Sequence, residues 1–176
     1  MSGSSGPVDA GDVAVREATE GDIPRIVELF EHGSLIEGKE DPTDPAPYRA
    51  ALHEIAQGPG AVLLAEVGGQ VIGVCQLIVF RHLQSRGGLC AEVESVHVHP
   101  EFRGRGVGGV LMRAAVQRAR QLGCYRVQLT SNNARPEAHR FYEALGFEPT
   151  HRGFKVNVPR PPAGEEPGGA GATPGR

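Results

Sequence analysis

The chain has 176 residues, of which 39% are hydrophobic, and this is enough for one globular domain with a buried core. The formal net charge of −3 offers no basic surface for phosphate contacts, so the composition argues against a nucleic-acid-binding protein. No apolar run approaches the roughly 18 residues of a membrane span, and three cysteines without metal-type spacing indicate buried free thiols in a cytoplasmic protein.

The folded domain is expected to cover residues 13–158. Residues 1–12 begin with MSGSSG and are interpreted as a disordered tail or the remnant of a tag. Residues 159–176 are rich in proline and glycine and nearly free of large apolar side chains, so they are predicted to be disordered.

The first half of the domain is predicted to contain a strand, two helices, a hairpin and a further strand, in this order at 13–18, 19–34, 48–60, 61–80 and 89–99. The first helix has one apolar face, made of Ile23, Ile26, Val27 and Phe30. The two apolar runs of the hairpin are joined by Gly68 and Gly69, a typical two-residue turn.

The second half is predicted to contain a helix, a strand, a helix and one or two closing strands, in this order at 107–122, 125–130, 135–146 and 147–158. The order of these elements predicts an α/β fold in which helices flank a mixed central sheet. We find no internal repeat.

The most unusual stretch is VHPEFRGRGVGG at 98–109, where a predicted strand passes into a predicted helix. Backbone N–H groups and the positive end of the helix dipole converge at such a point, and an anion can accept several hydrogen bonds there. The arginines of this turn, Arg103 and Arg105, would add positive charge. A loop that only needs positive φ angles explains the glycines equally well, and the spacing fits neither a P-loop nor a dinucleotide fingerprint.

The run Arg103-Gly104-Arg105-Gly106-Val107-Gly108 resembles the acetyl-coenzyme A signature of the GNAT family of N-acetyltransferases. RPEAHRFYEALGF at 135–147 resembles a conserved helix of the same family. This resemblance implies the GNAT-type acyl-CoA N-acyltransferase fold, acetyl-CoA as cosubstrate, and direct attack of an amine within a ternary complex. It implies that acetyl-CoA contacts the residues Val96, His97, Val98, Arg103, Gly104, Arg105, Gly106, Val107, Gly108 and Gly109.

One position departs from the family pattern. Arg135 stands seven residues before Tyr142, where many members carry a coenzyme-contacting asparagine. Asn132 lies just upstream and is a candidate substitute, while Arg135 could instead reach a phosphate of the coenzyme or of the substrate.

Two glutamates and a tyrosine are the candidate catalytic residues. Glu92 and Glu94 lie two apart on a predicted strand, so their side chains share one face, and a carboxylate pair raises at least one pKa. Both could equally be solvated or paired with arginines. The family resemblance favours Glu92 as the base and Glu94 as the second choice. It also implies that Tyr142 protonates the thiolate, although a tyrosine on an inner helix face is often only a core residue.

The histidines do not predict a metal site. His97 and His99 are expected to face the side of the strand opposite Glu92 and Glu94, so these four residues would not converge on one ion. His82 and His139 are interpreted mainly as exposed polar residues.

The acceptor is expected to be the primary amine of a small molecule. Arg81, His82 and Arg86 give this segment a positive character that would suit a phosphonate, phosphate or carboxylate group. The layout of the sequence motifs is most similar to that of the aminoalkylphosphonate acetyltransferases. The alternatives are a protein or peptide N-acetyltransferase and a non-catalytic acyl-CoA sensor. A homodimer is a family-level expectation, and neither a nucleic acid nor a membrane is an expected partner.

Overall fold

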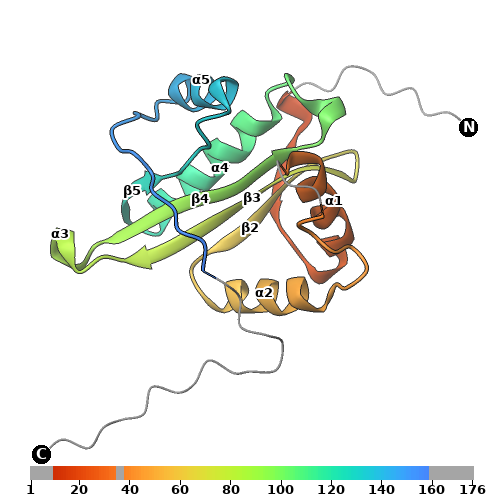
Figure 1. Ribbon diagram of the computed structural model, residues 1–176, viewed down its shortest axis with the longest axis horizontal. Helices are drawn as coiled ribbons and strands as arrows, with labels where there is room; N and C mark the ends of the chain where they lie inside the picture. The colour runs from red at the N-terminus through yellow and green to blue at the C-terminus, as the bar shows by residue number, and fades with distance from the viewer. Residues whose placement is uncertain (1–9, 35–37, 159–176) are drawn as a thin grey trace, which may run out of the picture.

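A five-stranded sheet forms the centre of the protein (Figure 1), in a computed structural model that describes residues 10–34 and 38–158. The strands are β1 (Ala14–Glu17), β2 (Ala61–Val67), β3 (Gln70–Arg81), β4 (Leu89–Val98) and β5 (Cys124–Gln128). They lie in chain order, antiparallel throughout except that β4 and β5 are parallel. The sheet is therefore mixed, which confirms the predicted α/β class.

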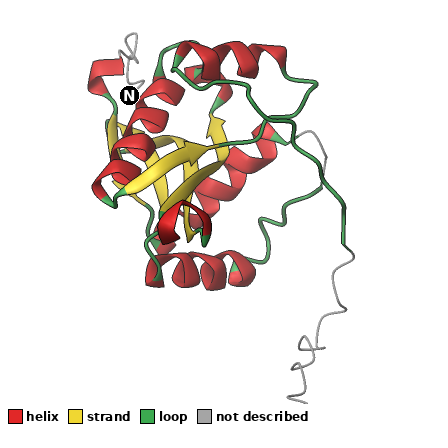
Figure 2. Cartoon of the chain, turned by 90° about the vertical axis from the view of Figure 1, so that its left-hand side faces the viewer, coloured by secondary structure: helices red, strands yellow, loops and turns green. Residues whose placement is uncertain are grey.

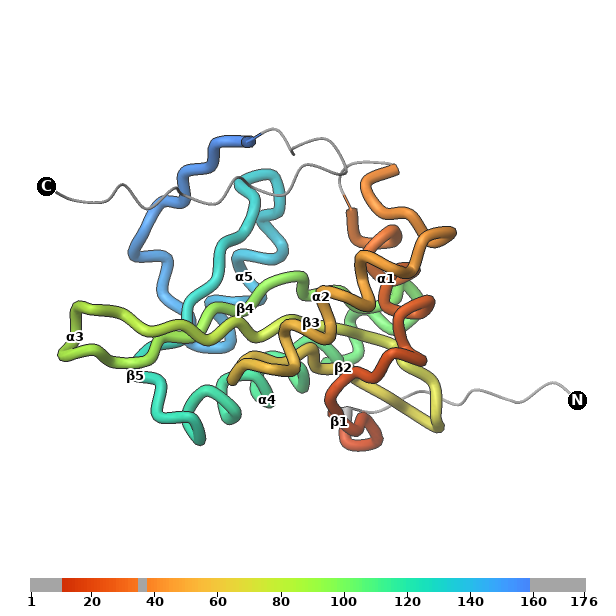
Figure 3. Tube along the Cα trace, turned by 90° about the horizontal axis from the view of Figure 1, so that it is seen from below, coloured from red at the N-terminus to blue at the C-terminus, as the bar shows by residue number. Residues whose placement is uncertain are grey.

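Helices cover both faces of this sheet (Figure 2). The helices are α1 (Ile23–Gly33), α2 (Ala46–Gln57), α3 (Gln84–Gly87), α4 (Val107–Gln121) and α5 (Pro136–Ala144), and three short 3-10 turns are η1 (Ala10–Asp12), η2 (Glu20–Asp22) and η3 (Pro100–Phe102). Helix α4 packs against all five strands, whereas α1 contacts β3 and β4 and α2 contacts β2. In Figure 3, α4 lies on the side of the sheet away from α1 and α2.

Each face of the sheet buries its own apolar cluster. The cluster under α4 combines strand residues such as Cys75 and Val93 with Leu111 and Met112 of the helix, all of them nearly inaccessible to solvent. The cluster under α1 is smaller and contains Ile26, Leu29, Leu64, Val71 and Val74. Because side chains alternate along each strand, neighbouring residues face different clusters. An irregularity that moves a residue to the other face therefore changes its surroundings, as in the site described below.

The start of α1 is fixed by a network of charged side chains. Asp22 accepts hydrogen bonds from the backbone N–H and the hydroxyl of Thr19, as in a capping box. Both carboxylate oxygens of Asp22 also accept from the Arg16 guanidinium at 2.8 Å, and Arg16 donates to Glu66 at 2.7 Å. These hydrogen bonds hold the pKa of Asp22 well below its usual range.

The predicted hairpin is confirmed, because β2 and β3 pair through the turn at Gly68 and Gly69, both with positive φ. The closing strands predicted at 147–158 are wrong, because these residues form no strand and continue as a loop (Figure 2). The prediction followed the alternation of Phe154, Val156 and Val158, but these side chains are exposed and have no strand partner among the described residues.

The ends of the chain lie largely outside the described residues. The tail expected at 159–176 falls outside them completely, as does most of the one expected at 1–12, of which residues 10–12 form the turn η1. Within the described ranges, none of the helices combines the length and the apolar character that spanning a membrane requires.

Candidate active site

The glycine turn joins β4 to α4 and has the conformation of an anion cradle. Gly106 is the N-cap of α4 with φ +79°, and Gly104 has φ +74°, so both occupy the left-handed region that favours glycine. The N–H of Val110 makes a first-turn bond of the helix, to the carbonyl of Gly106, which leaves the preceding amides without an intrahelical acceptor. The turn therefore presents N–H groups at the positive end of a 15-residue helix.

The other glycines of the turn serve packing rather than conformation. A Cβ at Gly108 would lie 3.1 Å from the Phe141 ring, so this glycine lets α5 approach α4 closely. A Cβ at Gly109 would lie 3.1 Å from Nη1 of Arg113. Val107 beside them is buried in the core.

The two arginines of the turn differ in their contacts. Arg103 donates from Nε to the carbonyl of Val98 and from Nη2 to the carbonyl of His32, so it fastens the turn to both β4 and α1. Arg105 lies over the ring of Phe102 and is otherwise exposed. Both guanidinium groups remain beside the cradle and make its surroundings positive.

Strands β4 and β5 separate before they reach the turn. Their parallel pairing ends at Glu92 and Gln128, and across the described residues the rest of β4, including Val96 and Val98, has no ladder partner on that side. The free edge of β4 thus offers backbone N–H and C=O groups that an extended ligand can pair with, as an added strand would. This opening leads from the glutamate pair to the glycine cradle.

Glu92 and Glu94 lie at the start of the opening and share one face of β4, as predicted. Glu92 accepts a hydrogen bond at 2.8 Å from Nε2 of Gln128, which stands opposite it on β5. The pKa of Glu94 is raised, first by burial and then by the negative charge of Glu92. A carboxylate with a raised pKa beside a second carboxylate suits proton abstraction from an ammonium group.

A bulge in β4 places His97 on the same face as the glutamates, so the predicted opposite orientation is wrong for this residue. Glu94 pairs with Gln76 and His97 with Val74, which is a step of three residues on β4 against two on β3. Ser95 absorbs the extra residue with φ +53°. Because side chains alternate along a strand, this insertion reverses the face for every residue after it.

His97 is a half-buried, neutral imidazole at the end of α1. Its ring contacts Phe30 edge-on at 5.4 Å between centroids, and a Cβ at Gly33 would collide with it. Burial, and after it the positive charges of Arg135, Arg103 and Lys39, lower the pKa of His97 to about 4. These cations surround the end of β4, a grouping that reasoning from the sequence missed because they come from three distant segments.

Tyr142 lies on α5 and is largely buried against the α4 side of the core, with the rings of Phe141 and Phe147 beside it. Burial raises the pKa of its hydroxyl, and Arg135 and Glu94 act on it with opposite signs. The tyrosine therefore remains protonated at neutral pH and lies within electrostatic range of Glu94.

Arg135 and Asn132 are held by the protein itself. Arg135 precedes α5 and donates from Nη2 to the carbonyl of Gly33 at 2.6 Å, which joins the start of α5 to the end of α1. Asn132 accepts from the N–H of Ala134 through its side chain and from Arg135 and His139 through its carbonyl. Asn132 thus shapes the loop before α5.

The cationic residues predicted near the acceptor lie around the β3–β4 connection. Arg81 donates to the carbonyl of Gly87, and His82 bonds the hydroxyl of Tyr125 at 2.7 Å. Arg86 belongs to α3, at the tip of the β3–β4 hairpin, which lies opposite the α1 end in Figure 1.

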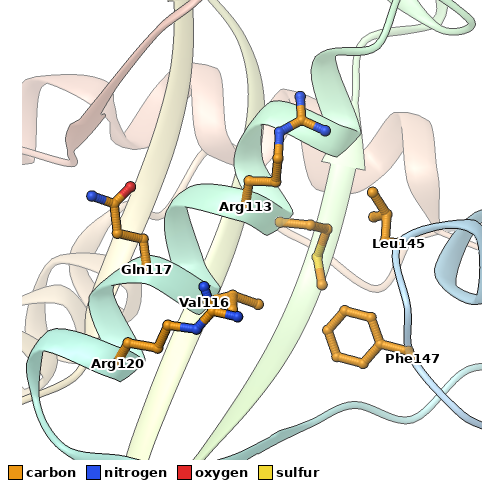
Figure 4. A pocket seen from close by; sticks show the side chains of 7 residues that line it. Arg113, Val116, Gln117, Arg120, Leu145 and Phe147 are labelled. Atoms are coloured by element: carbon orange, nitrogen blue, oxygen red, sulfur yellow. The ribbon is translucent and has the colours of Figure 1, made fainter.

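A groove of about 340 Å³ lies between α4 and the chain that follows α5 (Figure 4). It is lined by Met112, Arg113, Val116, Gln117, Arg120, Leu145 and Phe147. Arg113 connects it to the turn through its contact with Gly109.

The cysteines are all free, as expected, with Cys75 and Cys90 buried and Cys124 half-buried. Burial raises the pKa of Cys75 to about 12, so this thiol would be a poor nucleophile.

Comparison with known proteins agrees with this geometry. Residues 25–147 match the model of the acetyltransferase (GNAT) family. The aminoalkylphosphonate N-acetyltransferase of Salmonella typhimurium is 34% identical over 91 residues, which cover 52% of this chain and 58% of that enzyme. The chain thus matches little more than half of that relative's length.

Two further similarities extend over most of the chain. The glucosamine 6-phosphate N-acetyltransferase of Trypanosoma brucei brucei is 26% identical over 85% of this chain and 99% of its own length. A crystal structure described as a transcriptional regulator, from Bacillus halodurans, has a TM-score of 0.78 and 35% identity over 83% of this chain and 99% of its own.

Proposed function

This chain belongs to the acetyltransferase (GNAT) family, and we propose that it moves the acetyl group of acetyl-CoA to the primary amine of a small molecule that also carries an anionic group. One observation carries the proposal. A helix-start anion cradle and a carboxylate pair are connected by the free edge of β4, with a protonated tyrosine nearby.

The cofactor would bind along this edge. Its pyrophosphate would accept hydrogen bonds from the turn 104–109, and its pantetheine arm would pair with the backbone of Val96 and Val98. His97 lies between them in sequence, and Arg135 and Asn132 flank the opening from the side of α5. The groove along α4 is lined by apolar side chains together with Arg113 and Arg120, and it is suited to the remaining nucleotide part of acetyl-CoA.

Catalysis would begin with removal of a proton from the acceptor ammonium. Glu94 is the better base of the pair because its pKa is raised, whereas Glu92 is held by Gln128 and contributes the charge that raises it. The neutral amine then attacks the thioester carbonyl, which a backbone N–H of β4 can polarise. The C–S bond breaks, Tyr142 gives its proton to the departing thiolate, and the excess proton on the acceptor nitrogen is lost as the amide forms, which restores the tyrosine hydroxyl.

The acceptor would carry a phosphate or phosphonate group. Arg135, Arg103 and Lys39 act together on the end of β4, as their effect on the pKa of His97 indicates. Both curated relatives are named for acceptors that combine an amine with a phosphorus oxyanion. A sensor that only binds acyl-CoA would need neither the glutamate pair nor the protonated tyrosine.

Release of free coenzyme A thiol over a panel of amines tests this proposal. The panel pairs aminoalkylphosphonates and amino sugar phosphates with the same amines lacking the anion, and adds amino acids, polyamines and aminoglycosides. We expect kcat/KM to be about 10-fold or more higher for the phosphorus-bearing member of each pair, as one charge-assisted hydrogen bond provides. Acetyl-CoA binding without thiol release from any amine would instead indicate a sensor.

A further inference from the structure

A cluster of metal-ligating side chains lies outside the proposed catalytic machinery, where the end of α1 meets the end of β4. Glu28 and His32 stand four residues apart on one face of α1, and His99 follows β4 immediately. One ligand atom from each of the three residues lies within 4.8 Å of the other two. Spacing along the chain groups His99 with His97, so this cluster is apparent only in the folded protein.

The ring of His32 is held by a hydrogen bond within α1. Its Nδ1 is hydrogen-bonded at 2.8 Å to the backbone carbonyl of Glu28, one turn earlier in the helix. This bond fixes the ring and leaves Nε2 with its lone pair outward, which is the usual arrangement of a metal-bound histidine. The ring of His32 lies 5.2 Å from that of His99, between centroids.

His99 supplies an independent indication, because its Nδ1 is buried and has no hydrogen-bond partner in the described part of the chain. Its side chain is only 15% exposed, and the nearest carboxylate oxygen, from Glu101, is 3.9 Å from Nδ1. A buried polar atom without a partner costs free energy that a bound ligand would recover. The ring also contacts Phe102, which fixes its position.

Glu28 provides the anionic ligand. Arg25 contacts one of its oxygens, Oε2, at 2.7 Å, and holds the carboxylate in place beside the two histidines. The second oxygen has no hydrogen-bond partner in the parts of the chain that the structure describes.

We propose that Glu28, His32 and His99 bind one transition-metal ion of the zinc class, which ties helix α1 to the end of strand β4. Two imidazoles and one carboxylate are ligands that Zn²⁺ and Co²⁺ prefer, whereas Mg²⁺ and Ca²⁺ require oxygen ligands. With three protein ligands, water would complete the coordination. Because Arg103 donates to the carbonyl of His32, the ion would also stabilise the attachment of the glycine turn to α1.

Metal titration of the full chain without an affinity tag tests the site. After treatment with a chelator, we expect calorimetry to show one Zn²⁺ bound per chain, and Co²⁺ to give visible absorption that Zn²⁺ abolishes. His32→Gln, an exposed position where folding is not at risk, should weaken the affinity about 10-fold or more. His99→Asn should do the same, and Zn²⁺ should raise the Tm of the wild type but not of His32→Gln.

The matched control is His53→Gln, since His53 is an exposed histidine on α2. This variant should retain wild-type stoichiometry, affinity and Tm shift. The proposal would be overturned by a wild type that binds no Zn²⁺, or by unchanged binding in His32→Gln. Equal weakening in His53→Gln would also overturn it, because binding would then be adventitious.

Discussion

At the residue scale, Glu94 is the side chain on which the proposed chemistry depends most. Burial and the charge of Glu92 raise its pKa, so its carboxylate form is lost at a higher pH than that of an ordinary glutamate. A base must be deprotonated to act, and the rate should therefore fall as the pH drops through this raised value. Neutralising Glu92 would lower the pKa again.

We expect Glu94→Gln to reduce kcat by about 100-fold or more, the usual contribution of a general base, and to abolish the acidic limb of the pH–rate profile. The dissociation constant of acetyl-CoA should not change. Glu92→Gln is the comparison: it should reduce kcat less and shift the acidic limb to lower pH. If Glu92→Gln were the inactive variant and Glu94→Gln the active one, the two roles would be reversed.

In the proposed mechanism, Tyr142 carries out the second proton transfer. Because burial keeps its hydroxyl protonated, Tyr142→Phe should remove the proton donor with little change in packing, and kcat should fall about 100-fold with acetyl-CoA affinity retained. Steady-state kinetics and calorimetry on the same preparation measure both quantities. If Tyr142→Phe kept the wild-type kcat, Tyr142 would be only a core aromatic residue and not the proton donor.

At the scale of elements, helix α4 has a left-handed glycine beyond each end, Gly106 before it and Gly123 after it, with φ near +79° and +77°. Alanine at either position should cost about 1 kcal/mol of stability. Only Gly106→Ala should also weaken acetyl-CoA binding, since its strain falls on the cradle. Urea unfolding measures the stability of the two variants, and calorimetry measures their affinity for acetyl-CoA. If Gly123→Ala lost as much affinity as Gly106→Ala, the glycine turn would not be the binding site of the cofactor.

Much of the fold could be predicted because its elements have local signatures. The 3.6-residue period of α1, the Gly68–Gly69 turn and the glycine cradle are all present in short stretches of sequence. The bulge at Ser95 could not be predicted, since a positive φ at a serine has no sequence signature, and it alone decides which face His97 occupies. The exposed alternation at 154–158 predicted a strand that has no partner among the described residues.

The site was predicted less completely, because its contacts span long separations. Glu92, Glu94 and the glycine turn are close in sequence, and their placement on one strand followed from alternation. The bond from Arg135 to Gly33 crosses 102 residues, and two of the cations that act on His97, Lys39 and Arg135, also lie far from it in the sequence. Such contacts depend on how α1 and α5 pack at the end of β4, which no local pattern contains.

At the scale of the whole molecule, the Arg16–Asp22 network fastens the start of α1 to β1. The pKa of Asp22 is depressed in the folded state, so its stabilising contribution is present above the unfolded pKa of about 4 and is lost as the pH falls below it. Asp22→Asn should lower the free energy of unfolding at pH 7 by about 2 kcal/mol. The difference from wild type in urea unfolding should shrink as the solution is acidified, and a difference independent of pH would contradict this assignment.

One single-turnover measurement tests whether the acetyl group passes directly to the amine of a molecule that also carries an anionic group. The protein is mixed with acetyl-CoA that carries a ¹³C-labelled acetyl group and with an aminoalkylphosphonate, and all products are quantified by mass spectrometry. The label should appear in the amide of the acceptor, in a 1:1 ratio with free coenzyme A, without labelled protein. Label that remains in acetyl-CoA, or that is found on the protein or in free acetate, would contradict direct transfer.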